Sequence, residues 1–432
     1  MAMTSSIWSA IQTLVGNKKP GIQSRTRTLL SLSSSHQHDR AIIIKSVDTL
    51  IESSCPTTTL LHRLTMYQCL VWERLNTGHW SDVWEGWREL YGIIVIARMQ
   101  GMASICEENG IDNEELLLRD IIRLCDLGIM FSGHVMGGVL EEIAQLLTEF
   151  LSDKDINNDC FEDQDLSFKD TVPHKKVKLS PKFSISSQSL PLTLPILPVP
   201  VMSSPSLTTF LTQCKVPLTA TILRDCMTDW PCMQERRWCC DYLVKMAGPR
   251  TVPVELGNKY TDHSWTQQLI TVETFVRKYM MEKGTGVGYL AQHQLLEQVP
   301  SLARDILTPD YCYTGESEAE PDINVWIGPG GTVSPPHTDK KHNLLCQVVG
   351  TKYVALFYPD QGEKLYPDTN PMMHNTSMVD LECPDLTKFP LMSTLQGYHT
   401  LLREGEMLYI PPMVWHYVRS LEESFSVSFW WE

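Results

Sequence analysis

The last hundred or so residues of this chain form a succession of short segments in which apolar and polar side chains alternate. The segments run from residue 324 to the end and are separated by glycine and proline. Alternation with a period of two is typical of strands that bury one face. Many short strands with regularly spaced turn residues favour a double-sheet jelly-roll barrel. Such a barrel can hold a small cofactor in its mouth, because inward-facing and outward-facing residues alternate along each strand.

Three side chains of metal-ligating type lie in this strand-rich region. His337 and Asp339 are two positions apart, so both would point to one face of an extended strand. His416 stands within residues 408–417, just past a second strand-like segment. Two imidazoles and one carboxylate can hold ferrous iron and leave other coordination positions open. The motif alone is weak evidence in a chain with 13 histidines. The alternative is a strand-end histidine capped by a neighbouring carboxylate.

A lysine follows the first two of these residues. Residues 343–359 predict two short strands joined by a turn at Gly350, which is a hairpin pattern, and Lys352 stands at the start of the second strand among apolar neighbours. An ammonium group in an apolar interior needs an anionic partner. The end carboxylate of a metal-chelating 2-oxo acid would supply that charge. An ordinary surface lysine is the alternative.

Composition excludes several classes of function. The formal net charge of −15 argues against binding to duplex nucleic acid, which requires clustered lysine and arginine. It suits a basic polypeptide substrate, although an acidic surface also simply favours solubility. We expect no membrane association and an intracellular location, because no apolar stretch is long enough to span a bilayer and the first residues lack a secretory pattern. The 13 cysteines include no Cys-x-x-Cys pair, so a structural zinc site is not expected.

The pattern of the chain changes along its length and predicts an α+β protein in four parts. Residues 1–40 are expected to be a flexible N-terminus, and residues 41–151 show apolar residues at helical spacing, which predicts an all-α interaction domain that binds a protein partner. Residues 152–206 combine charge blocks with prolines and predict a flexible linker. Residues 207–432 are expected to form the catalytic domain, a double-stranded β-helix of the jelly-roll or cupin kind with flanking helices.

The predicted linker contains a short basic run. Its lysines fall within residues 175–178, inside a longer basic stretch at residues 173–182. Such a run resembles a nuclear import signal, although a solvated linker that happens to be basic is an equally good interpretation. We therefore expect a nuclear protein, with the cytoplasm as a second compartment. Unchanged nuclear entry after deletion of these lysines would exclude the signal.

Several linked motifs resemble those of the JmjC family of iron and 2-oxoglutarate dioxygenases. They occur in order at residues 288–293, 324–329, 337–339, 409–418 and 426–431, and the resemblance covers roughly residues 207–432. It implies that Fe(II) is the metal and that 2-oxoglutarate and dioxygen are cosubstrates. Pro336 and residues 340–342, beside the iron motif, follow no fixed pattern of the family. The resemblance also implies residue roles, with His337, Asp339 and His416 as iron ligands, and with Tyr289, Ser334, Asn343, Lys352 and Trp430 around 2-oxoglutarate.

The resemblance implies oxidative chemistry on a protein side chain but leaves the outcome open. We favour hydroxylation of arginine at C-3 in nuclear, chromatin-associated or ribosomal proteins, because no second chromatin-reading module with zinc-ligand cysteines is present. Glu255, with Trp265 and Trp326, could seat a guanidinium group by ion pairing and stacking. A strand-edge acid and two core indoles are an equally good interpretation of these three. The alternatives for the protein are a histone lysine N-methyl demethylase and a non-catalytic adaptor.

Overall fold

The computed structural model describes ten long stretches of the chain and a few positions before residue 30. The described protein divides into two compact units, the first comprising residues 1–160 with 246–251 and 298–300, and the second the remainder. The predicted import sequence and most of the predicted linker lie outside the described residues. The long stretches are residues 38–52, 57–77, 83–109, 114–133, 137–158, 196–257, 265–282, 286–315, 319–371 and 373–432.

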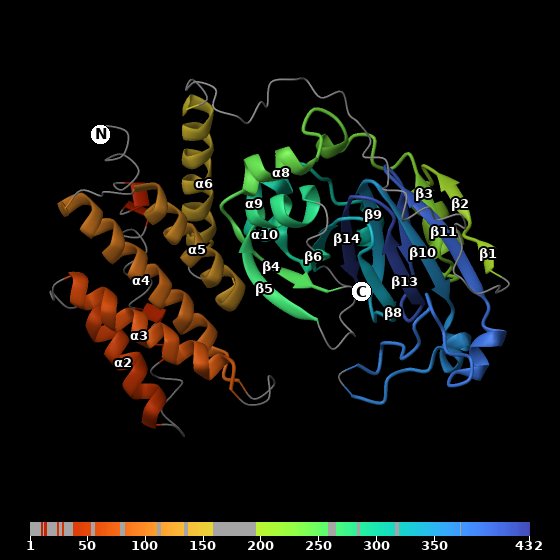
Figure 1. Ribbon diagram of the computed structural model, residues 1–432, viewed down its shortest axis with the longest axis horizontal. Coiled ribbons are helices and arrows are strands. Elements are labelled where there is room, and N and C mark those ends of the chain that lie inside the picture. Colours follow the sequence, from red (N-terminus) through yellow and green to blue (C-terminus); the bar gives the residue numbers. More distant parts are fainter. Residues whose placement is uncertain are drawn as a thin grey trace. The chain divides into compact units, whose positions relative to one another are not determined.

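The first unit contains a set of helices packed around one apolar core (Figure 1). In α5 the buried residues Leu118, Ile121, Ile122, Cys125 and Ile129 recur at the spacing of one helix face, which explains why the segment both forms a helix and packs. None of the described helices is both long and apolar enough to cross a membrane. The helices are α2 (His38–Glu52), α3 (Thr57–Leu75), α4 (Gly86–Asn109), α5 (Glu114–Ser132) and α6 (Val139–Asn158).

A buried ion pair lies in the same unit. The Arg250 guanidinium donates to Asp126 Oδ1 through Nε at 2.9 Å and Nη2 at 2.7 Å, and both side chains are fully buried. Gln298 Nε2 also donates to Asp126 Oδ1 at 2.7 Å, and the backbone N–H of Thr251 donates to Oδ2 at 2.6 Å. This carboxylate therefore has a counter-charge and several hydrogen bonds, as a buried charge requires.

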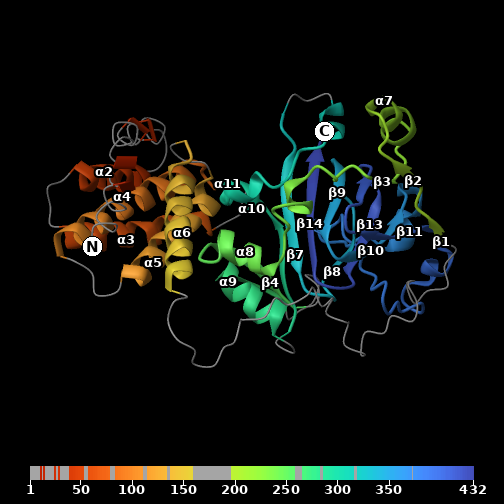
Figure 2. The same cartoon turned by 90° about the horizontal axis from the view of Figure 1, so that it is seen from above.

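The second unit is built on two sheets (Figures 1 and 2). The smaller sheet has the order β1-β11-β10-β13-β8, and the larger has the order β2-β3-β12-β9-β14-β7-β6-β4-β5. The predicted α+β class with a C-terminal jelly-roll is confirmed. The strands are β1 (Ile196–Pro198), β2 (Val201–Ser203), β3 (Thr221–Arg224), β4 (Thr251–Leu256), β5 (Thr266–Thr271), β6 (Gly288–His293), β7 (Asp322–Gly328), β8 (Val333–His337), β9 (His342–Val349), β10 (Thr351–Phe357), β11 (Gly397–Arg403), β12 (Met407–Ile410), β13 (Trp415–Ser420) and β14 (Ser424–Trp431).

Apolar side chains from both sheets meet in one core. Leu345 and Leu408 come from the larger sheet, and Val354, Leu356 and Val418 from the smaller, and all five are buried in a single cluster. Short flanking helices accompany the sheets, as the sequence predicts. They are α7 (Leu207–Phe210), α8 (Cys240–Ala247), α9 (Val272–Phe275), α10 (Leu295–Gln298) and α11 (Pro300–Ala303).

The predicted hairpin around Gly350 is wrong. The two strands form at the expected residues, but β9 pairs with β12 and β14, whereas β10 pairs with β11 and β13. Gly350, at φ +77°, therefore turns the chain from one sheet to the other. Its Cβ position would lie 1.9 Å from the carbonyl oxygen of Glu423, so only glycine fits. Period-two alternation predicts strands but does not specify their partners.

Three other boundaries differ from those that the sequence predicts. Helix α6 continues to Asn158, past the predicted linker start at residue 152, because its helical spacing continues into the charged segment. At the other end, β1 and β2 pair in parallel with β11 and β3, so residues 196–203 belong to the sheets despite their prolines. The sequence of residues 231–245 also predicts one helix, whereas the structure has a 3-10 turn at Pro231–Met233 and then the separate helix α8.

Candidate active site

The three ligand-type residues of the sequence lie together on neighbouring strands of the smaller sheet. His337 ends β8 and stands directly opposite His416 on β13, and Asp339 follows two residues after His337. One ligand atom from each lies within 4.8 Å of the others. The two imidazole centroids are 4.1 Å apart, and His416 Nε2 is 3.6 Å from Asp339 Oδ2. Antiparallel pairing therefore unites residues that are 77 to 79 positions apart in sequence.

Backbone contacts orient both imidazoles. His337 Nδ1 lies 2.8 Å from the carbonyl oxygen of Pro335, and His416 Nδ1 lies 3.0 Å from that of Val414. A carbonyl only accepts, so Nδ1–H is the donor in each ring and Nε2 keeps its lone pair for a metal. Burial and the neighbouring His416 lower the pKa of His337 to about 4, which keeps this imidazole neutral. Asp339 Oδ2 is buried without a hydrogen-bond partner. This donor set fits a divalent first-row metal such as iron.

Two loops hold the backbone around the first two ligands. Asn375 lies in the insertion between β10 and β11, where its carbonyl accepts from Thr338 N at 2.9 Å and its Nδ2 donates to the Thr338 carbonyl at 3.0 Å. From the other side, Met413 N donates to the carbonyl of Asp339 at 2.7 Å. Sequence reasoning missed Asn375, because an asparagine in a long loop carries no signal that links it to a distant strand.

A buried cation lies at the end of the site away from the three candidate metal ligands. Lys352 on β10 is 1% exposed, and its Nζ lies 3.3 Å from Tyr289 Oη on β6. No carboxylate of the described residues forms an ion pair with it. Burial lowers the pKa of Lys352 to about 7. Asn343 Oδ1 and Trp430 Nε1 are also buried without partners. An anion with oxygen acceptors would satisfy Lys352 and the Trp430 indole, and a dicarboxylate that chelates a metal is such an anion. Asn343 would present its amide N–H, not Oδ1, to this anion.

One cavity contains both ends, and both sheets contribute to its wall. The smaller sheet supplies residues of β8, β10 and β13, and the larger sheet those of β6, β7, β9, β12 and β14. Every residue that the sequence assigned to the metal or to 2-oxoglutarate lines this cavity. The lining residues are Tyr289, Trp326, Ser334, His337, Asp339, Asn343, Leu345, Lys352, Ile410, His416, Val418, Ser428 and Trp430.

Comparison with known proteins agrees with this geometry. A sequence model described as a cupin-like domain matches residues 215–432. Lysine-specific demethylase 8 of Xenopus tropicalis is 38% identical over 391 residues, covering 83% of this chain and 86% of the relative. The protein of the same name from Danio rerio is 39% identical over 386 residues, covering 88% and 89%.

The chain belongs to the JmjC family. The Drosophila melanogaster protein named Jumonji C domain-containing protein 5 is similar over a shorter stretch, at 43% identity over 242 residues, 54% of this chain and 60% of the relative. Members of the JmjC family depend on iron and 2-oxoglutarate, so this chain is a 2-oxoglutarate-dependent oxygenase. The resemblance inferred from the sequence motifs is thereby confirmed.

The three candidate substrate residues of the JmjC domain take different places. Trp326 on β7 lines the cavity, with its ring centroid 6.0 Å from that of Tyr289 and its indole N–H donating to Ser428 Oγ at 2.9 Å. Glu255 on β4 stands opposite Tyr289 in the strand register but does not line the cavity. Burial raises the pKa of Glu255, opposed by the nearby Trp265, which precedes β5.

Sequence reasoning also missed four residues in the wall of the JmjC cavity. Leu345, Val418 and Ser428 each stand two positions from a residue that was assigned to the site, namely Asn343, His416 and Trp430. Side chains two apart on a strand face the same way, so the period of two could have found all three. The fourth, Ile410, ends β12 and could be found only from the pairing of β12 with β9.

Proposed function

We propose that this oxygenase holds ferrous iron with His337, Asp339 and His416 and hydroxylates an arginine side chain of a basic protein at C-3. When bound, the iron with 2-oxoglutarate and dioxygen supplies the oxidising power to insert one oxygen atom into a C–H bond, while 2-oxoglutarate becomes succinate and carbon dioxide. Support for the metal comes from the two Nε2 atoms and the unpartnered carboxylate oxygen, which face one another within 4.8 Å.

The residues around the metal position the cosubstrate. The Lys352 ammonium pairs with the end carboxylate of 2-oxoglutarate, and the Tyr289 hydroxyl and Asn343 amide donate further hydrogen bonds. Leu345 and Ile410 also line the cavity, and an ion pair is stronger where its surroundings are apolar. A non-catalytic adaptor would have no use for a buried lysine close to three candidate metal ligands, because a desolvated charge destabilises the fold. These groups therefore argue for an enzyme.

The choice of arginine depends on one observation about Glu255. This carboxylate is partly buried, its pKa is raised by burial, and it forms no ion pair within the described part of the chain. It stands across from Tyr289, next to the cavity that holds the candidate metal ligands. A guanidinium group would supply the missing charge, match the carboxylate with two parallel hydrogen bonds, and stack on a neighbouring indole such as Trp326.

Demethylation of lysine is the second candidate. Two relatives carry the name lysine-specific demethylase 8, and the same oxidation of an N-methyl carbon would release formaldehyde. A methylated ammonium could lie against the rings of Tyr289 and Trp326, whose centroids are 6.0 Å apart. Such a cation keeps two N–H donors or fewer and lacks the planar fork of a guanidinium, however, so it matches the Glu255 carboxylate less well.

Purified full-length protein with Fe(II), ascorbate and 2-oxoglutarate decides between these reactions. Basic peptides containing arginine or methylated lysine are compared by succinate release and by the mass of the peptide product. We expect arginine peptides to gain one oxygen atom. Loss of a methyl group with formaldehyde would replace our proposal by demethylation, and the absence of peptide-dependent succinate would leave only the adaptor.

A pair of variants tests the role of Glu255. Glu255→Gln removes the charge that would pair with guanidinium, so we expect KM for the arginine peptide to rise about tenfold while 2-oxoglutarate binding stays unchanged. The exposed Glu363→Gln provides the same charge change elsewhere on this unit. Equal KM values for both variants would contradict substrate recognition by Glu255.

Two further expectations of the sequence stay proposals. A basic protein substrate fits the net charge of −15, and nuclear proteins rich in arginine would meet the enzyme if the lysines at residues 175–178 direct import. Deletion of those lysines in a fluorescently tagged full-length chain should move the protein from nucleus to cytoplasm. Unchanged localisation would exclude the signal.

A further inference from the structure

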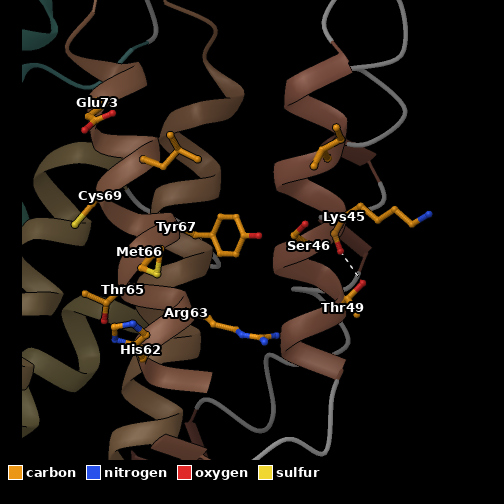
Figure 3. A pocket seen from close by; sticks show the side chains of 12 residues that line it. Lys45, Ser46, Thr49, His62, Arg63, Thr65, Met66, Tyr67, Cys69 and Glu73 are labelled. Carbon is orange, nitrogen blue, oxygen red and sulfur yellow. Dashed lines mark hydrogen bonds between the residues drawn. The ribbon is translucent and has the colours of Figure 1, made fainter. Parts of the chain in front are cut away.

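The outward face of helix α3 in the first unit borders two hollows. The first lies along α2 and α3 and has a volume of about 1010 Å³ (Figure 3). In the figure, Tyr67 and Arg63 of α3 extend toward α2. Two large apolar side chains of this hollow are strongly exposed, Ile42 at 50% and Met66 at 61%. Isolated exposed apolar residues are ordinary, but two of them beside a hollow make this face a candidate binding surface.

The second hollow, of about 600 Å³, is lined by residues of α3, α4 and α5. It shares Thr65, Cys69 and Glu73 with the first, so the two hollows are continuous along α3. Trp72, which is 46% exposed, lies in its wall together with Tyr91. We call the two hollows together the α3 face.

A cation without a counter-charge lies in the second hollow. Arg98 on α4 is partly buried, and its Nη1 donates to Gln68 Oε1, while Gln68 Nε2 in turn donates to Tyr91 Oη at 2.8 Å. The Nε atom of Arg98 is buried without a hydrogen-bond partner. No carboxylate in the part of the chain that the structure describes forms an ion pair with this guanidinium. Because buried charges are normally paired, this guanidinium needs a carboxylate that the described residues do not supply.

The charge of the α3 face is opposite in sign to that of the whole chain. Four cations line it, Lys45, Arg63, Arg98 and Arg123, against the two carboxylates of Glu73 and Asp120. The chain as a whole has a formal net charge of −15. The surface that best fits an acidic molecule is thus in the helical unit, whereas the candidate active site is proposed to take a basic one.

We propose that the α3 face binds an amphipathic helix of a partner protein, with an apolar stripe bordered by carboxylates. The α2 positions that line the first hollow are 42, 45, 46 and 49, which form one helix face, so the wall is straight enough for a helix to lie in it. Exposed tryptophan and desolvated arginine are typical of the residues that dominate binding energy at interfaces. This inference does not depend on the proposed hydroxylation.

A nucleic acid is the other polyanion to consider, and the α3 face suits it less well. Phosphate binding draws affinity from many cations along an open surface. Here four cations are interrupted by two carboxylates, and Arg98 is recessed among apolar side chains such as Leu124 and Leu127. A protein carboxylate next to an apolar residue fits such a recess, whereas a solvated phosphate backbone does not.

The test uses full-length protein and a display library of 18-residue helical peptides. The library fixes apolar residues at i, i+4, i+7 and i+11 and varies the other positions among Glu, Lys, Gln and Ala. We expect selection to enrich glutamate at the positions that border the apolar stripe. A fluorescein-labelled copy of the most enriched peptide should bind with an affinity that falls as salt is raised. Enrichment of lysine, or no enrichment over a scrambled library, would overturn the proposal.

Matched variants locate the binding site. Arg98→Gln should weaken the labelled peptide at least about tenfold, and Trp72→Ala about as much, because each removes an anchor. Arg88→Gln is the control: it makes the same change on the same helix, on an exposed residue ten positions away, roughly 15 Å along the axis. Thermal unfolding of each variant shows whether the helical unit stays folded, and Trp72→Ala tests the site if Arg98→Gln does not fold.

Two outcomes would contradict the assignment. Equal weakening by Arg98→Gln and Arg88→Gln would show a general charge effect rather than a site. A fluorescent single-stranded oligonucleotide that binds more tightly than the peptide, and that also loses affinity in Arg98→Gln, would show that the α3 face binds nucleic acid instead.

Discussion

Two fully buried cations, one in each unit, differ in whether the described protein supplies a counter-charge. Arg250 in the first unit is 0% exposed and donates twice to Asp126, which also accepts from Gln298 and Thr251. Lys352 in the second unit is 1% exposed, and among the described residues its ammonium has one hydrogen-bond partner, the Tyr289 hydroxyl at 3.3 Å. The first cation is compensated by the protein itself. The second has no counter-charge among the described residues, and we propose that a ligand supplies it.

The difference shows how a buried charge indicates function. A desolvated ion costs several kcal/mol unless it is paired. Where the fold provides the partner, as at Arg250, the ion pair serves the architecture. Where the fold provides no counter-charge, as at Lys352, the cost is retained in the free protein and is recovered when an anion binds. Burial alone therefore does not identify a functional lysine or arginine, whereas burial without a partner does.

The largest effect is expected at the compensated cation. Arg250→Met leaves Asp126 buried without its counter-charge and should destabilise the protein by roughly 3–5 kcal/mol. Denaturant unfolding of the full-length chain, followed by far-UV circular dichroism, measures this loss. The double variant Arg250→Met with Asp126→Leu removes both charges and should recover most of it. A single variant as stable as the parent would show that this pair does not support the fold.

The uncompensated cation should behave in the reverse way. Lys352→Met removes a desolvated charge, so stability should be unchanged or slightly raised, but the affinity for 2-oxoglutarate should fall by about 2–5 kcal/mol. Isothermal titration of the Mn(II)-loaded protein with 2-oxoglutarate measures the affinity. Lys388→Met, at an exposed lysine of the same unit, is the control. Unchanged affinity in Lys352→Met would remove this lysine from the cosubstrate site.

The affinity for 2-oxoglutarate should depend on pH through the ammonium group of Lys352. Burial lowers the pKa of Lys352 to about 7, so the free protein loses this proton above that pH, whereas the complex needs the charged ammonium. The affinity for 2-oxoglutarate should therefore be level below pH 7 and fall about tenfold per pH unit above it. In the ligand-free protein the unfolded state binds the extra proton, so the same group makes stability rise with pH above 7. An affinity that is constant from pH 7 to 9 would contradict an uncompensated Lys352.

The features that the sequence predicted correctly are those that depend on a local repeat or spacing of residues. The spacing of two correctly predicted that His337 and Asp339 lie close together, although Asp339 stands two residues past the end of β8, and helical spacing identified the first unit. The sequence did not predict which sheet each strand joins, as the chain reversal at Gly350 illustrates, nor the Arg250 to Asp126 pair, whose members are 124 positions apart. Contacts of this kind are set by the packing of distant segments and leave no periodic trace in the sequence.

The smallest effect is expected at Asn375, which contacts the backbone of the metal-ligand segment through a neutral hydrogen bond rather than a charged one. The Asn375 side chain donates to the carbonyl of Thr338, which stands between His337 and Asp339. Asn375→Ala should weaken Mn(II) binding about fivefold, corresponding to roughly 1 kcal/mol for one hydrogen bond. Electron paramagnetic resonance of free Mn(II) measures this affinity without turnover.

Ser393→Ala is the matched control for Asn375→Ala, because it removes one side-chain hydrogen bond to a carbonyl from an exposed residue of the same insertion. If both variants weaken metal binding equally, the insertion acts through its general stability. If only Asn375→Ala weakens metal binding, the Asn375 amide itself holds the segment that carries His337 and Asp339.

Neither variant should change the pH at which 2-oxoglutarate affinity begins to fall, because that pH is set by the desolvation of Lys352. Lys352 lies on β10, which pairs with the strand of His416 on the side opposite to β8. A shift of that pH in Asn375→Ala would mean that the metal end and the cation end of the cavity are mechanically linked, and that the two ends cannot be treated as separate sites.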